Sequence, residues 1–191
     1  MIIHKTIKGI VIRKNRNDTY DPPTSISMNW KHWKATWDLK TCKACKDMHG
    51  KIYAMFDERN PVPPLHLNCR CVVEPMESVA VGIGTKDGSA GADWWLRNYG
   101  VLPSNYISEA DIRSLGWDNG ESPVKYIQGK MVTMGDYQNI NGHLPQEAGR
   151  VWYEADINYY SGKRNGHRIV WSNDGLTFVT YDHYRTFIEV A

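Results

Sequence analysis

The second half of this sequence is dominated by a run of predicted short strands, and that run constrains the fold more than any other feature. Polar and apolar residues alternate over 151–159, which is typical of a half-buried strand. Further on, Asn173-Asp174-Gly175 separates two β-type runs, at 168–172 and 176–181, and is a strong hairpin signal. A last strand is predicted over 185–190. The pattern indicates an antiparallel meander.

Two helices are predicted ahead of these strands, over 92–99 and 109–115. Ser108 is suited to be the N-cap of the second helix, with Asp111 at its third position. Gly116 and Trp117 end that helix. Helices followed by an antiparallel meander indicate an α+β fold for residues 92–191.

Residues 75–91, PMESVAVGIGTKDGSAG, contain small residues and no large aromatic side chain. This composition predicts a linker, which divides the chain into 1–74, 75–91 and 92–191. Before the linker, residues 2–13 have a weak strand pattern. Trp30, Trp33 and Trp37 are spaced as on one packed face of a short helix.

All four cysteines precede the predicted linker. They form a Cys42-x2-Cys45 pair and a Cys69-x-Cys71 pair separated by a spacer of 23 residues, with His66 three positions before Cys69. Structural zinc takes four such ligands, so the spacing favours a closed zinc site with Cys42, Cys45, Cys69 and Cys71 as ligands and His66 as a further candidate. Two disulfides, or free thiols, are the alternatives.

The strings TCKACKDMHGKIY and PVPPLHLNCRC, within residues 36–73, resemble the C-terminal end of phage head-morphogenesis (minor capsid) proteins. The resemblance covers a short part of the chain. It implies a phage-derived or toxin-delivery context for the small Cys-rich segment 1–74. It does not imply an activity.

Charge is unevenly distributed along the chain. Residues 1–91 contain 14 basic and 9 acidic residues, whereas residues 92–191 contain 9 and 12. Any RNA contact in the second half therefore depends on a few placed cations and not on a general basic surface. No stretch approaches the roughly 18 apolar residues of a membrane span, so no membrane partner is expected.

The strand over 151–159 places Glu154, Asp156 and Asn158 on one face, which predicts an open, wet side of the sheet. A carboxylate, an imidazole and two guanidinium groups on adjacent strands can cleave a phosphodiester without metal. The carboxylate removes the ribose 2′-OH proton and the imidazolium protonates the leaving oxygen, giving a 2′,3′-cyclic phosphate. These groups are Glu154, Arg164, Arg168 and His183.

Three strings, ADWWLRNYGVLPSNYIS, GRVWYEADINYYSGKRNGHRI and YDHYRTF, resemble the barnase-type microbial ribonucleases over about 92–190. The resemblance implies an endoribonuclease that needs no cofactor for catalysis. It implies Glu154 as general base, His183 as general acid, Arg164 and Arg168 as phosphate-binding residues, and Tyr184 as an aromatic lining the base site.

The sequence departs from that family at three positions. A catalytic Lys at the start of the second helix is replaced by Glu109, and the guanine-reading Arg and Glu by Ile140 and Asn141. An amide offers guanine one acceptor and a competing donor, so guanine preference is expected to weaken or shift. The remaining candidate substrate-binding residues are Asn139 and Lys163.

Together these features predict a toxin-like RNA endonuclease attached to a phage-head-like segment. The resemblance implies a small acidic inhibitor (immunity) protein as its partner, and delivery or phage association followed by action in a target cytoplasm. The alternative is a catalytically weakened ribonuclease fold that serves as an RNA-binding or interaction module of a phage structural protein.

Overall fold

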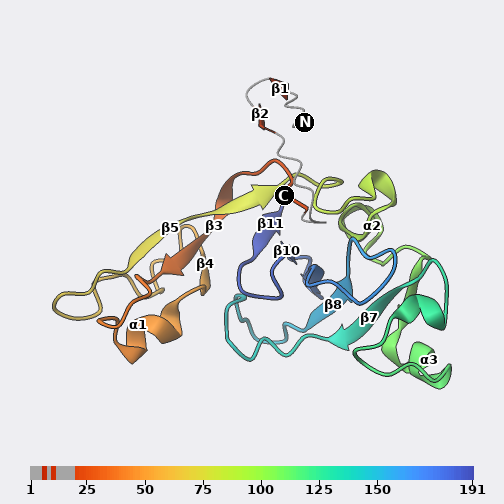
Figure 1. Cartoon of the computed structure of the whole chain (residues 1–191). Coiled ribbons are helices and arrows are strands. Elements are labelled where there is room, and N and C mark those ends of the chain that lie inside the picture. The colour runs from red at the N-terminus through yellow and green to blue at the C-terminus, as the bar shows by residue number, and fades with distance from the viewer. Residues whose placement is uncertain (1–5, 8–9, 12–19) are drawn as a thin grey trace.

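The computed structural model describes residues 6–7, 10–11 and 20–191, and its main feature is one mixed sheet of nine strands (Figure 1). Along the sheet the order is β4-β3-β5-β11-β10-β9-β8-β7-β6, and β1 pairs with β2 separately. The strands are β1 (Thr6–Ile7), β2 (Ile10–Val11), β3 (Ser25–Lys34), β4 (Ile52–Ala54), β5 (Val72–Val79), β6 (Tyr106–Ser108), β7 (Met131–Asp136), β8 (Trp152–Asp156), β9 (Arg168–Ser172), β10 (Thr177–Thr180) and β11 (Ile188–Val190).

The predicted meander is confirmed by four consecutive antiparallel strands, β8 to β11. The hairpin between β9 and β10 turns at Gly175, whose φ of 94° suits glycine. β8 is shorter than the predicted strand. It ends at Asp156 because Asn158 adopts a φ of 58°, which redirects the chain.

Both predicted helices are present, as α2 (Ala92–Tyr99) and α3 (Glu109–Ser114). Gly100 ends α2 in the left-handed conformation. Ser108 caps α3, because its Oγ accepts a hydrogen bond from the Asp111 amide at 3.0 Å. The chain also contains α1 (Lys43–Met48) and two short 3-10 helices, at Gly88–Ala90 and Pro123–Lys125. Few helices on a large sheet give a mixed α+β fold.

The first part of the segment predicted to be a linker, residues 75–91, lies in the sheet, while the division of the chain into 1–74, 75–91 and 92–191 stays a prediction. Its first residues, 75–79, complete β5, which pairs with β3 on one side and runs parallel to β11 on the other. Beyond β5, the buried carboxylate of Asp93 accepts hydrogen bonds from Gly82, Gly84 and Thr85. The two halves of the chain therefore share one sheet, as Figure 1 shows where β5 lies beside β11.

The helix predicted from Trp30, Trp33 and Trp37 is wrong. The first two tryptophans lie in β3, which pairs regularly with β4 from Trp30 to His32, and they pack in different core clusters. β3 has a bulge between Ile26 and Lys31. At the bulge, Ser27 Oγ accepts hydrogen bonds from the amides of Asn29 and Trp30. Trp33 is fully buried, whereas Trp37 lies beyond the strand and is exposed.

The sheet has an apolar core on each face. On one face, Leu96 of α2 packs with Ile169 and Val179. On the other, Ile52 of β4 and Met76 of β5 pack in one cluster with Leu144, Trp152, Val170, Phe178 and Phe187. Residues of the first half thus complete the core beneath the second half.

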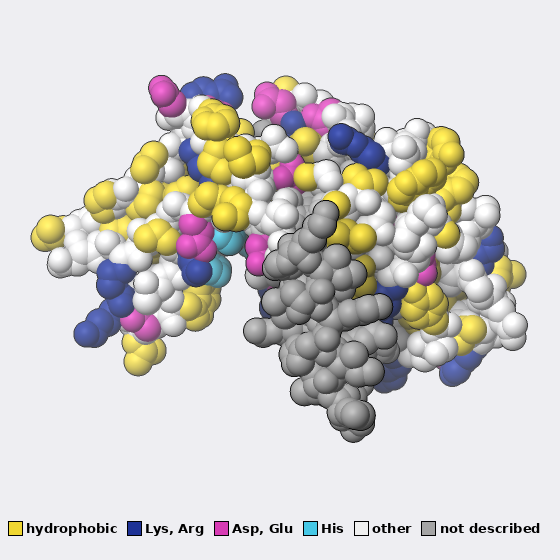
Figure 2. Space-filling model, turned by 90° about the horizontal axis from the view of Figure 1, so that it is seen from above, with side chains coloured by type: hydrophobic (Ala, Val, Ile, Leu, Met, Phe, Trp, Pro, Cys, Tyr) yellow, Lys and Arg dark blue, Asp and Glu magenta, His cyan; other side chains and the backbone are white. Residues whose placement is uncertain are grey.

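Charged side chains do not gather on the face shown in Figure 2, where Lys and Arg residues are scattered among hydrophobic ones. Within the described residues, no helix has both the length and the apolar character needed to cross a bilayer.

Candidate active site

Three side chains, those of Glu154, His183 and Tyr184, border two adjoining depressions in the surface. We call the first, of about 580 Å³, the loop depression, because residues 136–141 and His143 line it. We call the second, of about 540 Å³, the arginine depression. It is also lined by Asn119, Lys163, Arg164 and Arg168.

Glu154 lies in the middle of β8 and is partly buried. Burial raises its pKa above the ordinary value for a glutamate, because the charged form loses solvation. Three groups oppose that rise: the hydroxyl of Tyr184, which donates to Glu154 Oε2, and the positive charges of Arg168 and Arg164. A carboxylate with a raised pKa is a better proton acceptor than an exposed one.

His183 is exposed on the loop that follows β10. His183 and Tyr184 both have positive φ angles, of 61° and 67°, which are unfavourable for residues with side chains. Asp182 holds this loop: its Oδ1 accepts from the amides of Arg185 and Thr186. The imidazole of His183 lies 4.8 Å from the Tyr184 ring, measured between centroids.

The two candidate phosphate-binding arginines meet at one buried carboxylate, that of Asp156. Arg164 donates two hydrogen bonds to it, at 2.7 and 2.8 Å, and Arg168 Nη1 lies 3.1 Å from Asp156 Oδ1. Arg164 also donates to Asn119. The buried Nε of Arg168 has no hydrogen-bond partner within the described residues. Both guanidinium groups are therefore held in place, and one retains an unused donor.

The predicted open face of β8 is only partly open. Glu154 reaches the depressions, but Asp156 is fully buried and Asn158 nearly so. Arg164 and Arg168 cover Asp156, while the amide of Lys86 and the ring of His167 contact Asn158. The error came from treating charged residues on a strand as solvated, although paired guanidinium groups can bury a carboxylate.

The predicted substrate-binding residues in the loop after β7 differ in where their side chains point. Asn141 is exposed and lines the loop depression, and Ile140 beside it is 90% exposed. The amide of Asn139 instead bonds the N–H and the C=O of Leu144, so this side chain shapes the loop. Tyr137 stacks on Tyr184 with ring centroids 5.3 Å apart, which builds an aromatic wall.

Of the charged residues Lys163 and Glu109, only Lys163 lines the arginine depression. Lys163 is exposed and lines the depression beside Arg164. Glu109 begins α3, and its carboxylate pairs with Arg113 at 2.8 Å. That ion pair partly neutralises the charge that Glu109 introduces.

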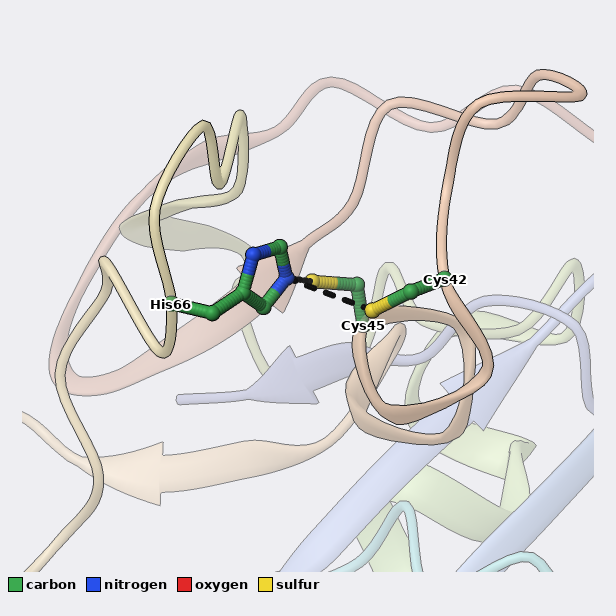
Figure 3. Close-up of side chains that lie close together, drawn as sticks. All are labelled: Cys42, Cys45 and His66. Atoms are coloured by element: carbon green, nitrogen blue, oxygen red, sulfur yellow. Dashed lines mark hydrogen bonds between the residues drawn. The ribbon is translucent and has the colours of Figure 1, made fainter.

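The sulfur atoms of the four cysteines converge, and none forms a disulfide. His66 joins them: its Nε2 lies 3.2 Å from the Sγ atoms of both Cys42 and Cys45 (Figure 3). The Sγ atoms of Cys45 and Cys69 are 3.7 Å apart. Backbone hydrogen bonds, above all from the N–H of Cys71, lower the pKa of Cys69 to about 7. The geometry thus adds His66 to the four predicted ligands.

Sequence reasoning missed the positioning roles of two residues, Asp156 and Asp182. The signal for Asp156 was its spacing, two residues after Glu154 on the same face of β8 and beside Arg168 on β9. The signal for Asp182 was an aspartate four residues before Thr186, a pattern that lets a carboxylate bond nearby amides.

An α+β sheet with a carboxylate, an imidazole and two guanidinium groups around one cleft is an arrangement typical of one class of protein, the small enzymes that act on phosphodiesters. Residues 96–191 match the family model described as ribonuclease, and the chain belongs to this family. Residues 3–74 match the model described as Phage Mu protein F like protein.

Individual relatives agree with the family model. A protein named Ribonuclease from Heyndrickxia coagulans is 42% identical over 109 residues, which are 56% of this chain and 97% of that protein. Proteins named Ribonuclease from Bacillus intermedius and Bacillus pumilus are also 42% identical over 109 residues, again 56% of this chain but 65% of their own length.

Proposed function

We propose that this protein is an RNA endonuclease that cleaves by attack of the ribose 2′-OH, with Glu154 as general base and His183 as general acid. The observation that carries the proposal is that both side chains border the same two depressions, where a phosphodiester can reach both. The substrate class is RNA, because DNA has no 2′-OH.

In the first half of the reaction, the Glu154 carboxylate accepts the 2′-OH proton as the 2′-oxygen attacks phosphorus. The raised pKa of Glu154 favours this transfer. His183, as imidazolium, donates its proton to the 5′-oxygen as the bond from phosphorus to that oxygen breaks. The product is a 2′,3′-cyclic phosphate, and the step needs neither metal nor cofactor.

Arg164 and Arg168 stabilise the charge that develops on the phosphoryl oxygens. Asp156 fixes both guanidinium groups, so little reorganisation is needed when the transition state forms. Arg168 lines the arginine depression, where its positive charge attracts a phosphoryl oxygen. Lys163 adds a mobile charge at the edge of the arginine depression.

The loop depression receives the base that precedes the cleaved bond. The stacked rings of Tyr137 and Tyr184 offer it an aromatic surface, and Asn141 a hydrogen-bonding edge. Asn139 acts indirectly, by holding the loop through Leu144. An exposed Ile140 and an amide at Asn141 favour a weaker guanine preference than a carboxylate would give.

The biological role that we propose is that of a toxin delivered in a phage-derived context and active in a target cytoplasm. The match of residues 3–74 to the Phage Mu protein F like model supports the context. An open cleft holding exposed His183 and Lys163 beside two guanidinium groups fits a small acidic inhibitor protein, since acidic side chains complement such a surface.

The decisive experiment measures the turnover of RNA at saturating concentration in EDTA, with analysis of the product ends. We expect 2′,3′-cyclic phosphate ends from the wild type and a loss of at least about 10³-fold in turnover for Glu154→Gln and His183→Ala. Glu147→Gln and His32→Ala, which change an exposed Glu and a His of β3, are the matched controls. RNA binding without cleavage would instead identify an RNA-binding module.

A further inference from the structure

The Cys42, Cys45 and His66 side chains are arranged as metal ligands are. In Figure 3 the His66 ring points its Nε2 at the two sulfur atoms. Its Nδ1 lies 2.8 Å from the carbonyl oxygen of Leu67, which accepts the Nδ1 proton and leaves a lone pair on Nε2. Histidines that bind metal are oriented by such a bond on the other nitrogen.

The distances fit one tetrahedral zinc ion. Bonds of about 2.3 Å to sulfur and about 2.05 Å to nitrogen put two sulfur ligands about 3.8 Å apart and a sulfur and a nitrogen about 3.6 Å apart. The observed separations are 3.7 Å between the Sγ atoms of Cys45 and Cys69, and 3.2 Å from His66 Nε2 to the Sγ atoms of Cys42 and Cys45.

The space between the donors also fits an ion. A cavity of about 20 Å³ is lined by side chains that include Cys42, Cys45, His66 and Cys71. Cys45, Cys69 and Cys71 form a second trio whose sulfur atoms lie within 4.8 Å of one another. Cys45 belongs to both trios, so one ion can reach all of the donors with a small movement.

The metal cluster is connected to the ribonuclease half through a short stretch of chain. Cys45 lies in α1, and His49 follows that helix and accepts a hydrogen bond from the Ala35 amide. Gly50 comes next, with a φ of 82°, and the place of its absent Cβ is 3.2 Å from the His143 ring. Ile52 then donates its N–H to the His143 carbonyl at 2.8 Å.

We infer that one zinc ion is bound by Cys42, Cys45, His66 and one thiolate of the Cys69–Cys71 pair, and that this ion holds the His143 part of the loop depression in place. His143 lines that depression, so the order of α1 and β4 sets the shape of the surface that receives the base. The effect on RNA cleavage rests on the proposed function, whereas metal binding does not.

The first test measures zinc by mass spectrometry in the full chain after reconstitution and gel filtration. We expect one zinc per chain in the wild type and in His32→Ala, and less than a tenth in His66→Ala. A second arm compares Cys69→Ser with Cys71→Ser, and one of them should keep its zinc. The ligand set would be overturned if the wild type held no zinc. It would also be overturned if His66→Ala kept its full zinc while both serine variants lost theirs.

The second test compares zinc-loaded and zinc-stripped wild type by hydrogen exchange, which needs no RNA cleavage. The Ile52 amide and residues 138–144 should exchange at least about tenfold faster without zinc, and zinc added back should restore protection. If RNA is cleaved, KM should rise about tenfold with little change in kcat. Equal exchange in the two forms would disprove the link between metal and loop even in a fully active enzyme.

Discussion

The hydroxyl of Tyr184 donates a hydrogen bond to Glu154 Oε2, and this contact joins the two depressions of the active site. It also favours the charged carboxylate, against the burial that raises the Glu154 pKa. Tyr184 itself is held at a positive φ by the loop that Asp182 organises. The protonation of Glu154, the proposed general base, therefore depends on the conformation of the loop that carries His183, the proposed general acid.

Removal of this bond by Tyr184→Phe should move the acidic limb of the kcat/KM profile to higher pH, by on the order of one pH unit. The sign follows because a lost donor destabilises the carboxylate, so the Glu154 pKa rises and more of the base is protonated at a given pH. Tyr126→Phe is the matched control, since it removes a tyrosine–glutamate bond to Glu121. A shift to lower pH would contradict the assignment of Glu154 as base.

Asp156→Asn should lower the free energy of unfolding by about 3–5 kcal/mol and reduce kcat, because it leaves two buried guanidinium groups short of their counter-charge. Urea denaturation measures the first effect. The comparison is Asp174→Asn, which breaks the more exposed pair with Arg150 and should change stability by about 1 kcal/mol or less. Similar losses in both variants would show that burial of Asp156 has no special effect.

Glu109→Lys should raise kcat/KM about tenfold at low salt, because it replaces a negative charge by a positive one at the start of α3. Added salt should diminish the gain. Glu109→Gln removes the negative charge without adding a positive one. Its kcat/KM should lie between those of the wild type and Glu109→Lys. An unchanged rate in both variants would place Glu109 too far from the phosphate to matter.

Asn141→Glu should increase the preference for guanine about tenfold or more, measured with dinucleotides that differ in the first base. A carboxylate accepts from both the N1–H and the N2–H2 of guanine, whereas the amide places a donor against one of them. Asn141→Gln has the length of glutamate and keeps the amide, so it should leave the preference unchanged. Equal gains in both variants would assign the effect to length.

Ile52→Ala should lower the free energy of unfolding by about 2–5 kcal/mol in a single transition, because Ile52 is 4% exposed and lies in the core shared by both halves. Ile26→Ala, at a 69% exposed position in β3, should change it by about 0.5 kcal/mol or less. Two separate unfolding transitions, with only the first affected, would mean that the halves fold independently.

Local features of the fold could be predicted from the sequence. α2 begins and ends where its pattern indicates, Ser108 caps α3, and the hairpin turns at Gly175. Each of these depends on residues within a few positions of one another. The tryptophan spacing misled because it also fits a strand, where residues three apart point to opposite faces, and Trp30 and Trp33 do pack in different core clusters.

The candidate site could be predicted as a set of residues but not as an arrangement. Periodicity placed Glu154 on a strand face, and the motif resemblance added His183, Arg164 and Arg168. The burial of Asp156 needed two guanidinium groups from separate segments, and the orientation of Asn139 needed Leu144. The pairing of β5 with β11 joins strands distant in sequence, and neither strand alone indicates its partner.

That pairing sets an order of events during protein synthesis. β11 lies between β5 and β10, and the Ser27 hydroxyl bonds to Glu189, a residue 162 positions later. The ribosome must therefore release residues 188–190 before β5 can pair with β11 and the shared core can close. A nascent chain stopped short of that point carries Glu154 but lacks the completed sheet around it, so we expect the proposed nuclease activity to arise only once β11 has left the ribosome.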